Sequence, residues 1–199
     1  MISRMFFLDF IKNKKNLLLK FFIPFIIVTV AFQFGFGKIT LVMLLIFTVI
    51  TGSGLKIIKL KTSGVYNRLI ISPLGKSNLF LEIATITSLF YFIQFIPALF
   101  VAAFFGDILI IPYSIIAIII IVFIGILIGI HAKSFGDIHL YSILAFIPLI
   151  GFVMVKSNFS LIFPFISIVD SEYTIFTLIT PCITILFLCF ILIFDVKRL

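Results

Sequence analysis

The sequence predicts an all-α integral membrane protein with six transmembrane helices and both termini in the cytoplasm. Of its 199 residues, 63% are hydrophobic and 11% are charged, and the mean hydropathy of +1.42 lies far outside the range of soluble domains. Six apolar runs come near the roughly 20 residues that a bilayer-spanning helix needs. We therefore predict a single transmembrane domain over residues 1–199, with spans at about 17–36, 39–55, 79–105, 112–130, 140–155 and 174–194.

The basic residues between the spans indicate the orientation. With both termini inside, the outer side keeps only Lys38 and Lys156 of the 15 Lys and Arg residues. Positive residues collect on the cytoplasmic side of membrane proteins and attract anionic lipid. The net charge of +8 therefore predicts the lipid bilayer, and not nucleic acid, as the partner. The predicted cytoplasmic residues are Arg4, Lys12, Lys14, Lys15, Lys20, Lys56, Lys59, Lys61, Arg68, Lys76, Lys133, Lys197 and Arg198.

Residues 1–16 precede the first span as an amphipathic segment. Five apolar side chains share one arc of a helical wheel, namely Ile2, Phe6, Phe7, Phe10 and Ile11. This pattern predicts an N-terminal interfacial helix along the inner leaflet, and an ordinary charged flank is the alternative. No small-residue cleavage site follows the apolar run, so we expect that run to be retained as the first span. The Ile, Phe and Lys bias and the short loops are typical of a prokaryotic plasma-membrane protein.

The connection between the second and third spans, residues 56–78, is longer than a turn needs and has no acidic residue. The residue before a proline is pushed out of helical geometry, so Ser72-Pro73 is expected to end a short helix. Ser77 or Asn78 can cap the helix that follows. The segment also has an apolar side that predicts contact with another protein. The residues of that side are Val65, Leu69, Ile70 and Ile71.

This connection contains Gly64, Arg68, Leu69 and the tripeptide Ser72-Pro73-Leu74. In these residues and in its hydropathy pattern, the chain resembles the membrane (permease) subunits of type 2 ABC exporters. The resemblance implies that 56–78 is a cytoplasmic coupling hairpin whose helix contacts a separate nucleotide-binding ATPase, with loop 131–140 as a smaller second contact. It also implies a second membrane subunit, identical or a sister chain, and ATP and Mg²⁺ on the ATPase. The implied contact residues are Gly64, Val65, Tyr66, Arg68, Leu69, Ile70 and Pro73.

The chain itself lacks the parts of a catalytic or cofactor site. Gly75-Lys76-Ser77 looks like the end of a phosphate-binding loop, but Ile70 occupies the position that needs another glycine. His131 and His139 have only Asp137 beside them, which is a poor set for a metal ion. The spans offer no nucleophile–base pair. We therefore expect no catalytic residue, no metal site and no cofactor on this chain.

Two polar residues inside the third span are functional candidates. Intramembrane carboxylates often mark substrate pathways, so Glu82 is a candidate pathway or coupling residue, and pairing with Lys76 or Arg68 at the surface is the alternative. Gln94 lies deeper, where it either lines a pathway or bonds to a neighbouring helix. The scarcity of charge in the spans favours an amphipathic or lipid-like cargo, because a small ion would be costly to desolvate.

Residues 156–173 are predicted to lie outside the cell. The apolar run 159–169 is too short to span and is interrupted by Pro164, which predicts a short re-entrant or interfacial segment before the last span. Its position resembles that of a segment that closes the outer side of the pathway in type 2 exporters. That resemblance makes Phe163, Pro164 and Phe165 the candidate outer gate.

Gly125 and Gly129 form a small-xxx-small pair in the fourth span. Such a pair lets another helix approach closely, and the partner is either a helix of the same chain or a second subunit. For the function, the alternative to an exporter subunit is a non-transport membrane protein, such as a peptide immunity or sensor protein without an ATPase.

Overall fold

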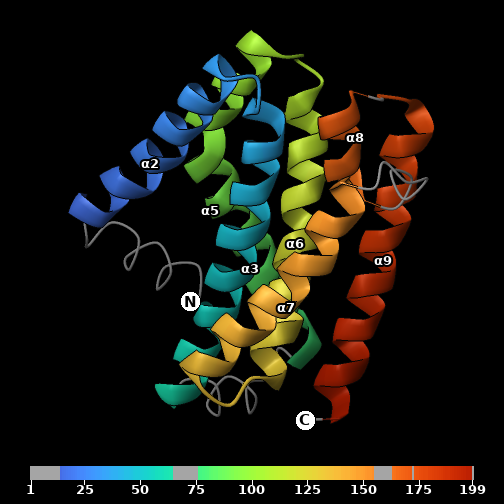
Figure 1. Cartoon of the computed structure of the whole chain (residues 1–199). Coiled ribbons are helices and arrows are strands. Elements are labelled where there is room, and N and C mark those ends of the chain that lie inside the picture. The colour runs from blue at the N-terminus through green and yellow to red at the C-terminus, as the bar shows by residue number, and fades with distance from the viewer. Residues whose placement is uncertain (1–13, 65–75, 155–162, 172, 199) are drawn as a thin grey trace.

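The computed structural model of the chain describes residues 14–64, 76–154, 163–171 and 173–198. These residues form seven helices and no strand, which confirms the predicted all-α class (Figure 1). The helices are α2 (Lys14–Gln33), α3 (Gly37–Thr62), α5 (Lys76–Phe105), α6 (Ile110–His131), α7 (Phe135–Met154), α8 (Pro164–Asp170) and α9 (Ile175–Arg198).

Five of the described helices, α3, α5, α6, α7 and α9, are long and apolar enough to cross a membrane. The chain is therefore a multi-pass membrane protein. The described apolar part of α2 is Leu18–Gln33, which is shorter than the other five helices. The sixth span therefore stays a prediction. The predicted interfacial helix falls almost wholly on residues 1–13, outside the described residues, and residues 14–16 belong to α2.

Large apolar side chains also cover the outside of the bundle. On α9, Phe176, Ile183 and Phe190 recur every seven residues with 61–68% of their surface exposed. Residues seven apart lie on one face of a helix, so this face of α9 points away from the other helices. Leu144 and Ile147 are similarly exposed on α7. Faces of this kind would be costly in water and are suited to contact with lipid chains.

Helix boundaries differ most from the prediction around the second span. That span was predicted to end at residue 55, but α3 continues to Thr62, because Ile57, Ile58 and Leu60 remain buried against the bundle. At the other end of the predicted hairpin, α5 begins at Lys76. The connection between the two helices therefore spans residues 63–75 and is shorter than the predicted 56–78.

The helices lie side by side, with α3 and α6 in the middle of the bundle (Figure 1). Helix α3 contacts α2, α5, α6, α7 and α8, and α6 contacts α3, α5, α7, α8 and α9. The end of α3, the α6–α7 connection and the C-terminal end of α9 lie at the lower end of the bundle in Figure 1. The α2–α3 and α5–α6 connections lie at the upper end. Alternate connections thus lie at opposite ends, as in a helical bundle that crosses a membrane repeatedly.

The closest helix contact is between α3 and α6. A Cβ atom added at Gly129 would lie 2.8 Å from the carbonyl oxygen of Gly54, and one added at Gly125 would lie 1.8 Å from Ser53 Oγ. Ser53 donates within its own helix to the Val49 carbonyl oxygen at 2.6 Å, so its hydroxyl needs no partner on α6. Gly125 and Gly129 therefore serve packing within the chain, which was one of the two alternatives for this pair.

We expect Gly129→Ala to destabilise the protein, because the new methyl group meets backbone of α3 and one of the helices must shift. Overpacking of this kind costs about 1–3 kcal/mol, measurable as a lower midpoint of thermal unfolding in detergent. Gly151→Ala on α7 is the matched control, since a Cβ atom there meets nothing within 4 Å. Equal stability of the two variants would contradict the α3–α6 contact.

Candidate functional site

The two ends of the bundle differ in charge. The lower end in Figure 1 carries Lys59, Lys61 and Lys133 on or beside the helix ends, and we call it the basic end. The opposite end carries Lys38 together with the carboxylates Asp107 and Asp170. The segments singled out by the resemblance, 63–75 and the α6–α7 connection, both begin at the basic end.

Most of the predicted ATPase-contact residues lie outside the described residues. They are Val65, Tyr66, Arg68, Leu69, Ile70 and Pro73. Gly64 is described, and it follows α3 with φ of +68° while its N–H donates to the Lys61 carbonyl oxygen at 3.3 Å. A glycine in this left-handed conformation commonly ends a helix. Gly64 therefore fixes the point at which the chain leaves α3.

Lys61 joins the last turn of α3 to the end of α6. Its Nζ donates to the carbonyl oxygens of Ile130 and, at 3.2 Å, of Ala132. The last carbonyl groups of a helix lack partners within the helix and favour a positive charge beside them. The lysine thus satisfies two acceptors at the C-terminal end of α6 and connects the two segments that begin at the basic end.

The start of α7 is fixed by a reciprocal cap that the sequence analysis did not recognise. Asp137 Oδ2 accepts from the backbone N–H groups of Lys133 and Ser134, both at 2.9 Å, while Ser134 Oγ accepts from the Asp137 N–H at 3.2 Å. The spacing Ser134-x-x-Asp137 is that of a capping box and could have revealed this cap from the sequence.

Among the described residues, no three His, Cys, Asp or Glu side chains are placed to hold a metal ion.

The sequence analysis assigned Lys56 to the hairpin. In the structure it lies within α3, and its Nζ is 5.0 Å from the centroid of the Tyr91 ring and 5.4 Å from that of Phe90. An ammonium group at such distances is attracted by aromatic rings. Gly52 makes room for Tyr91, since a Cβ atom there would lie 1.8 Å from the tyrosine oxygen.

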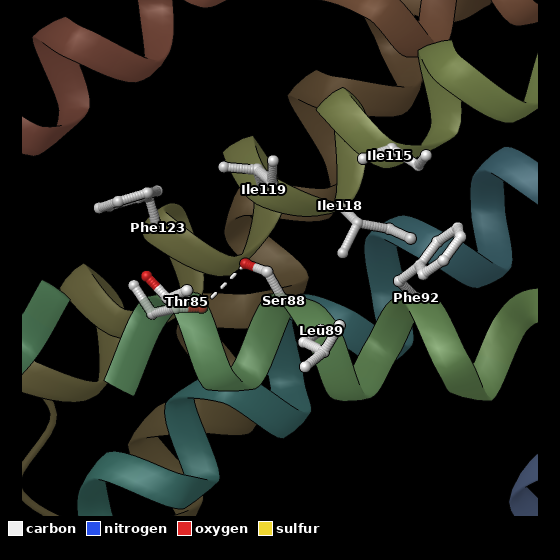
Figure 2. Close-up of a pocket in the computed structure, with 9 residues that line it drawn as sticks. Thr85, Ser88, Leu89, Phe92, Ile115, Ile118, Ile119 and Phe123 are labelled. Atoms are coloured by element: carbon white, nitrogen blue, oxygen red, sulfur yellow. Dashed lines mark hydrogen bonds between the residues drawn. The ribbon is translucent and has the colours of Figure 1, made fainter. Parts of the chain in front are cut away.

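A cleft of about 330 Å³ lies between α5 and α6 (Figure 2). Its α5 side is formed by Ala84, Thr85, Ser88, Leu89 and Phe92. Its α6 side is formed by Ile115, Ile118, Ile119 and Phe123. These residues lie near the middle of both helices, so the cleft is at mid-depth in the bundle.

The cleft is apolar although two hydroxyl groups line it. Thr85 Oγ1 donates to the Leu81 carbonyl oxygen at 2.9 Å, and Ser88 Oγ donates to that of Ala84 at 2.8 Å, the bond drawn in Figure 2. Both hydroxyls are therefore satisfied by α5 itself. The floor is buried, with Ile118 1% exposed, whereas Leu89 at the rim is 59% exposed. The cleft is thus open toward the outside of the bundle.

Glu82 lies on α5 three residues before Thr85 and is half-buried. It forms no hydrogen bond or ion pair with another described residue. Its predicted partners, Arg68 and the side chain of Lys76, lie outside the described residues, so that pairing stays a prediction. Gln94 is 9% exposed. Within the described part of the chain, its side chain forms no hydrogen bond to a neighbouring helix. Both roles predicted for Gln94 stay predictions.

The candidate outer-gate residues lie at the start of α8. Pro164 is the first residue of that helix, where its missing N–H costs nothing. The ring of Phe163 stacks on Phe165 with centroids 5.1 Å apart, and on Phe152 of α7 at 6.1 Å. Residues 164–168 are buried, and α8 contacts α3, α6, α7 and α9. The short segment before the last long helix is therefore packed inside the bundle.

Polar contacts hold the chain on either side of α8. Lys38 Nζ, at the start of α3, donates to Ser171 Oγ. The Tyr113 hydroxyl of α6 donates to the Thr174 carbonyl oxygen at 2.7 Å and lies 2.8 Å from Thr177 Oγ1. Burial raises the pKa of the neighbouring Tyr173 to about 12, so this phenol stays uncharged at physiological pH. Helices α3 and α6 are thus linked to α8 and α9 at the end opposite the basic end.

The chain was compared with known proteins at three levels. No protein-family model, no curated protein and no solved structure matches it.

We expect Tyr113→Phe to lower stability by about 1–2 kcal/mol, because its hydroxyl loses its contacts with the Thr174 carbonyl oxygen and Thr177 Oγ1. Thermal unfolding in detergent measures the loss. Tyr141→Phe is the control, since Tyr141 is 39% exposed and should be neutral. If both variants unfold at the wild-type temperature, the Tyr113 contacts do not hold α9 to α6.

Proposed function

We propose that this chain is the transmembrane subunit of an ATP-driven ABC exporter that moves an amphipathic or lipid-like cargo. In this proposal the segment that follows α3 binds a separate nucleotide-binding ATPase, which carries ATP and Mg²⁺, and a second membrane subunit completes the pathway. The single observation that supports it most is the Lys61 link. It connects the two segments expected to contact an ATPase, one after α3 and the other between α6 and α7.

The proposed topology places the basic end in the cytoplasm of a prokaryotic cell. Lysines and arginines collect on the cytoplasmic side. Among the described residues, Lys59, Lys61 and Lys133 lie at one end of the bundle, together with Asp137, whereas Lys38, Asp107 and Asp170 lie at the other. With α2 as the sixth span, both termini lie inside. The proposal assigns the plasma membrane as the location and gives the chain itself no catalytic role.

The coupling mechanism follows from the helix contacts. Closure of the ATPase around ATP would displace the segment beyond Gly64 and hence the end of α3. Because α3 and α6 touch at Gly54, Gly125 and Gly129 and are joined by Lys61, they would move as one unit. At the opposite end, contacts of α3 and α6 with α8 would pass the displacement to the Phe163–Phe165 cluster.

Co-purification with a candidate ATPase, encoded next to this chain, tests the proposal. We expect the wild type to retain the ATPase in lipid and the Arg68→Glu, Leu69→Asp double variant to lose it, because the change inverts charge and removes apolar contact at the predicted interface. A double variant at the opposite end, Lys38→Glu with Leu109→Asp, is the control and should retain the ATPase.

Two results would overturn the exporter assignment. Either no ATPase associates with the wild type, or the Arg68→Glu, Leu69→Asp variant inserts normally and binds the ATPase as well as the wild type does. In the first case a non-transport immunity or sensor protein becomes the better interpretation.

A further inference from the structure

A carboxylate, that of Glu82, lies on α5 just before the residues that line the α5–α6 cleft. Glu82, Thr85 and Leu89 are spaced i, i+3 and i+7 along α5, and residues at this spacing share one face of a helix. Thr85 and Leu89 line the cleft, so Glu82 lies on the same face one turn closer to the basic end. Glu82 is half-buried and has no partner among the described residues.

The depth of Glu82 fits the boundary between lipid chains and headgroups. The apolar part of α5, Asn78–Phe105, has 28 residues and is about 42 Å long at 1.5 Å per residue. The hydrocarbon core of a bilayer is about 30 Å thick. With this helix centred in the bilayer, about 6 Å extends beyond the core at each end, and Glu82 lies four residues, or about 6 Å, from Asn78. Its carboxylate is therefore at the inner edge of the core.

The chemistry of the cleft selects an alkyl chain. Both hydroxyl groups in its wall donate to α5 carbonyls, so neither has a hydrogen left to donate to a polar ligand. A volume of about 330 Å³ is about twice that of a cavity that holds benzene, and it matches one chain better than the body of a phospholipid. Leu89 at the rim leaves the cleft open sideways, toward lipid.

We propose that the α5–α6 cleft binds a single-chain amphiphile with a cationic head, whose alkyl chain fills the cleft and whose head is bound by Glu82. An ionised carboxylate accepts hydrogen bonds only, and its bonds with a cation are short and strong. An ammonium head on a medium-length chain meets both requirements. This inference names a ligand class for the proposed exporter and rests on its membrane placement alone, not on ATPase coupling.

Because the chain contains no tryptophan, a single introduced tryptophan reports on binding. Phe92→Trp and Phe123→Trp place the reporter at opposite ends of the cleft, so that the loss of one variant to misfolding leaves the other. Phe187→Trp on the exposed face of α9 is the control for ordinary lipid contact, since Phe187 is 63% exposed and lies midway along its helix. Each variant is placed in phosphatidylcholine nanodiscs without any ATPase.

The probe is dodecylammonium brominated along its chain, because bromine quenches tryptophan emission on contact. We expect saturable quenching at the cleft reporters and only a linear response at position 187. Adding Glu82→Gln should raise the half-saturating concentration about ten-fold, the loss expected for one charged hydrogen bond. The equally brominated dodecanoate should bind more weakly than the ammonium probe by a similar factor.

Three outcomes would overturn the proposal. Equal, linear quenching at all positions would mean that ordinary lipid fills the cleft. Quenching at position 187 but not in the cleft would mean that another helix, such as one from a second copy, covers it. Saturable binding that ignores both head charge and Glu82→Gln would leave a site for chains alone, without the cationic specificity. None of these results bears on whether an ATPase binds the segment after α3.

Discussion

The close approach of α3 and α6 is the constraint on which the other features of this bundle depend. In a membrane, helices gain little from leaving the surrounding lipid, so they associate through van der Waals packing and hydrogen bonds. Gly54, Gly125 and Gly129 allow backbone-to-backbone contact between these two helices. Each of α3 and α6 contacts five helices, and α5, α7 and α8 contact both of them. The separation of α3 and α6 therefore determines where these three helices lie. Helices α7 and α9 keep exposed apolar faces that are suited to contact with lipid.

Polar contacts at the two ends of the bundle join elements that are distant in sequence. Lys61 binds the carbonyl end of α6, and the Ser134–Asp137 cap fixes where α7 starts. At the other end, Tyr113 binds the chain that enters α9. Between these ends the described core consists mainly of packed apolar side chains. In the proposed exporter, this packed core would transmit a displacement at one end of the bundle to the other.

Hydropathy and charge were sufficient to predict the helical class and the positions of the long helices, because lipid imposes one length and one polarity on every span. The glycine spacing also identified one side of the α3–α6 contact. The partner at Ser53 and Gly54 could not be read from the sequence, since it depends on which helices are neighbours. A hydropathy criterion ends a span at the first lysine, so it could not show that Lys56 continues α3, where its ammonium group lies near aromatic rings of α5. The cleft depends on side-chain volumes across two helices and leaves no local signal.

In the proposed exporter, a displacement at the basic end reaches α8 through the α3–α6 pair. The most direct measurement is the rate of thiol labelling at Asp170→Cys, at the end of α8, in a background with Cys182→Ala and Cys189→Ala and with the ATPase bound. This account predicts that the rate differs several-fold between the nucleotide-free complex and one held in the ATP-bound state by a hydrolysis-deficient ATPase. An identical rate in both states, in a complex that hydrolyses ATP and moves cargo, would contradict it.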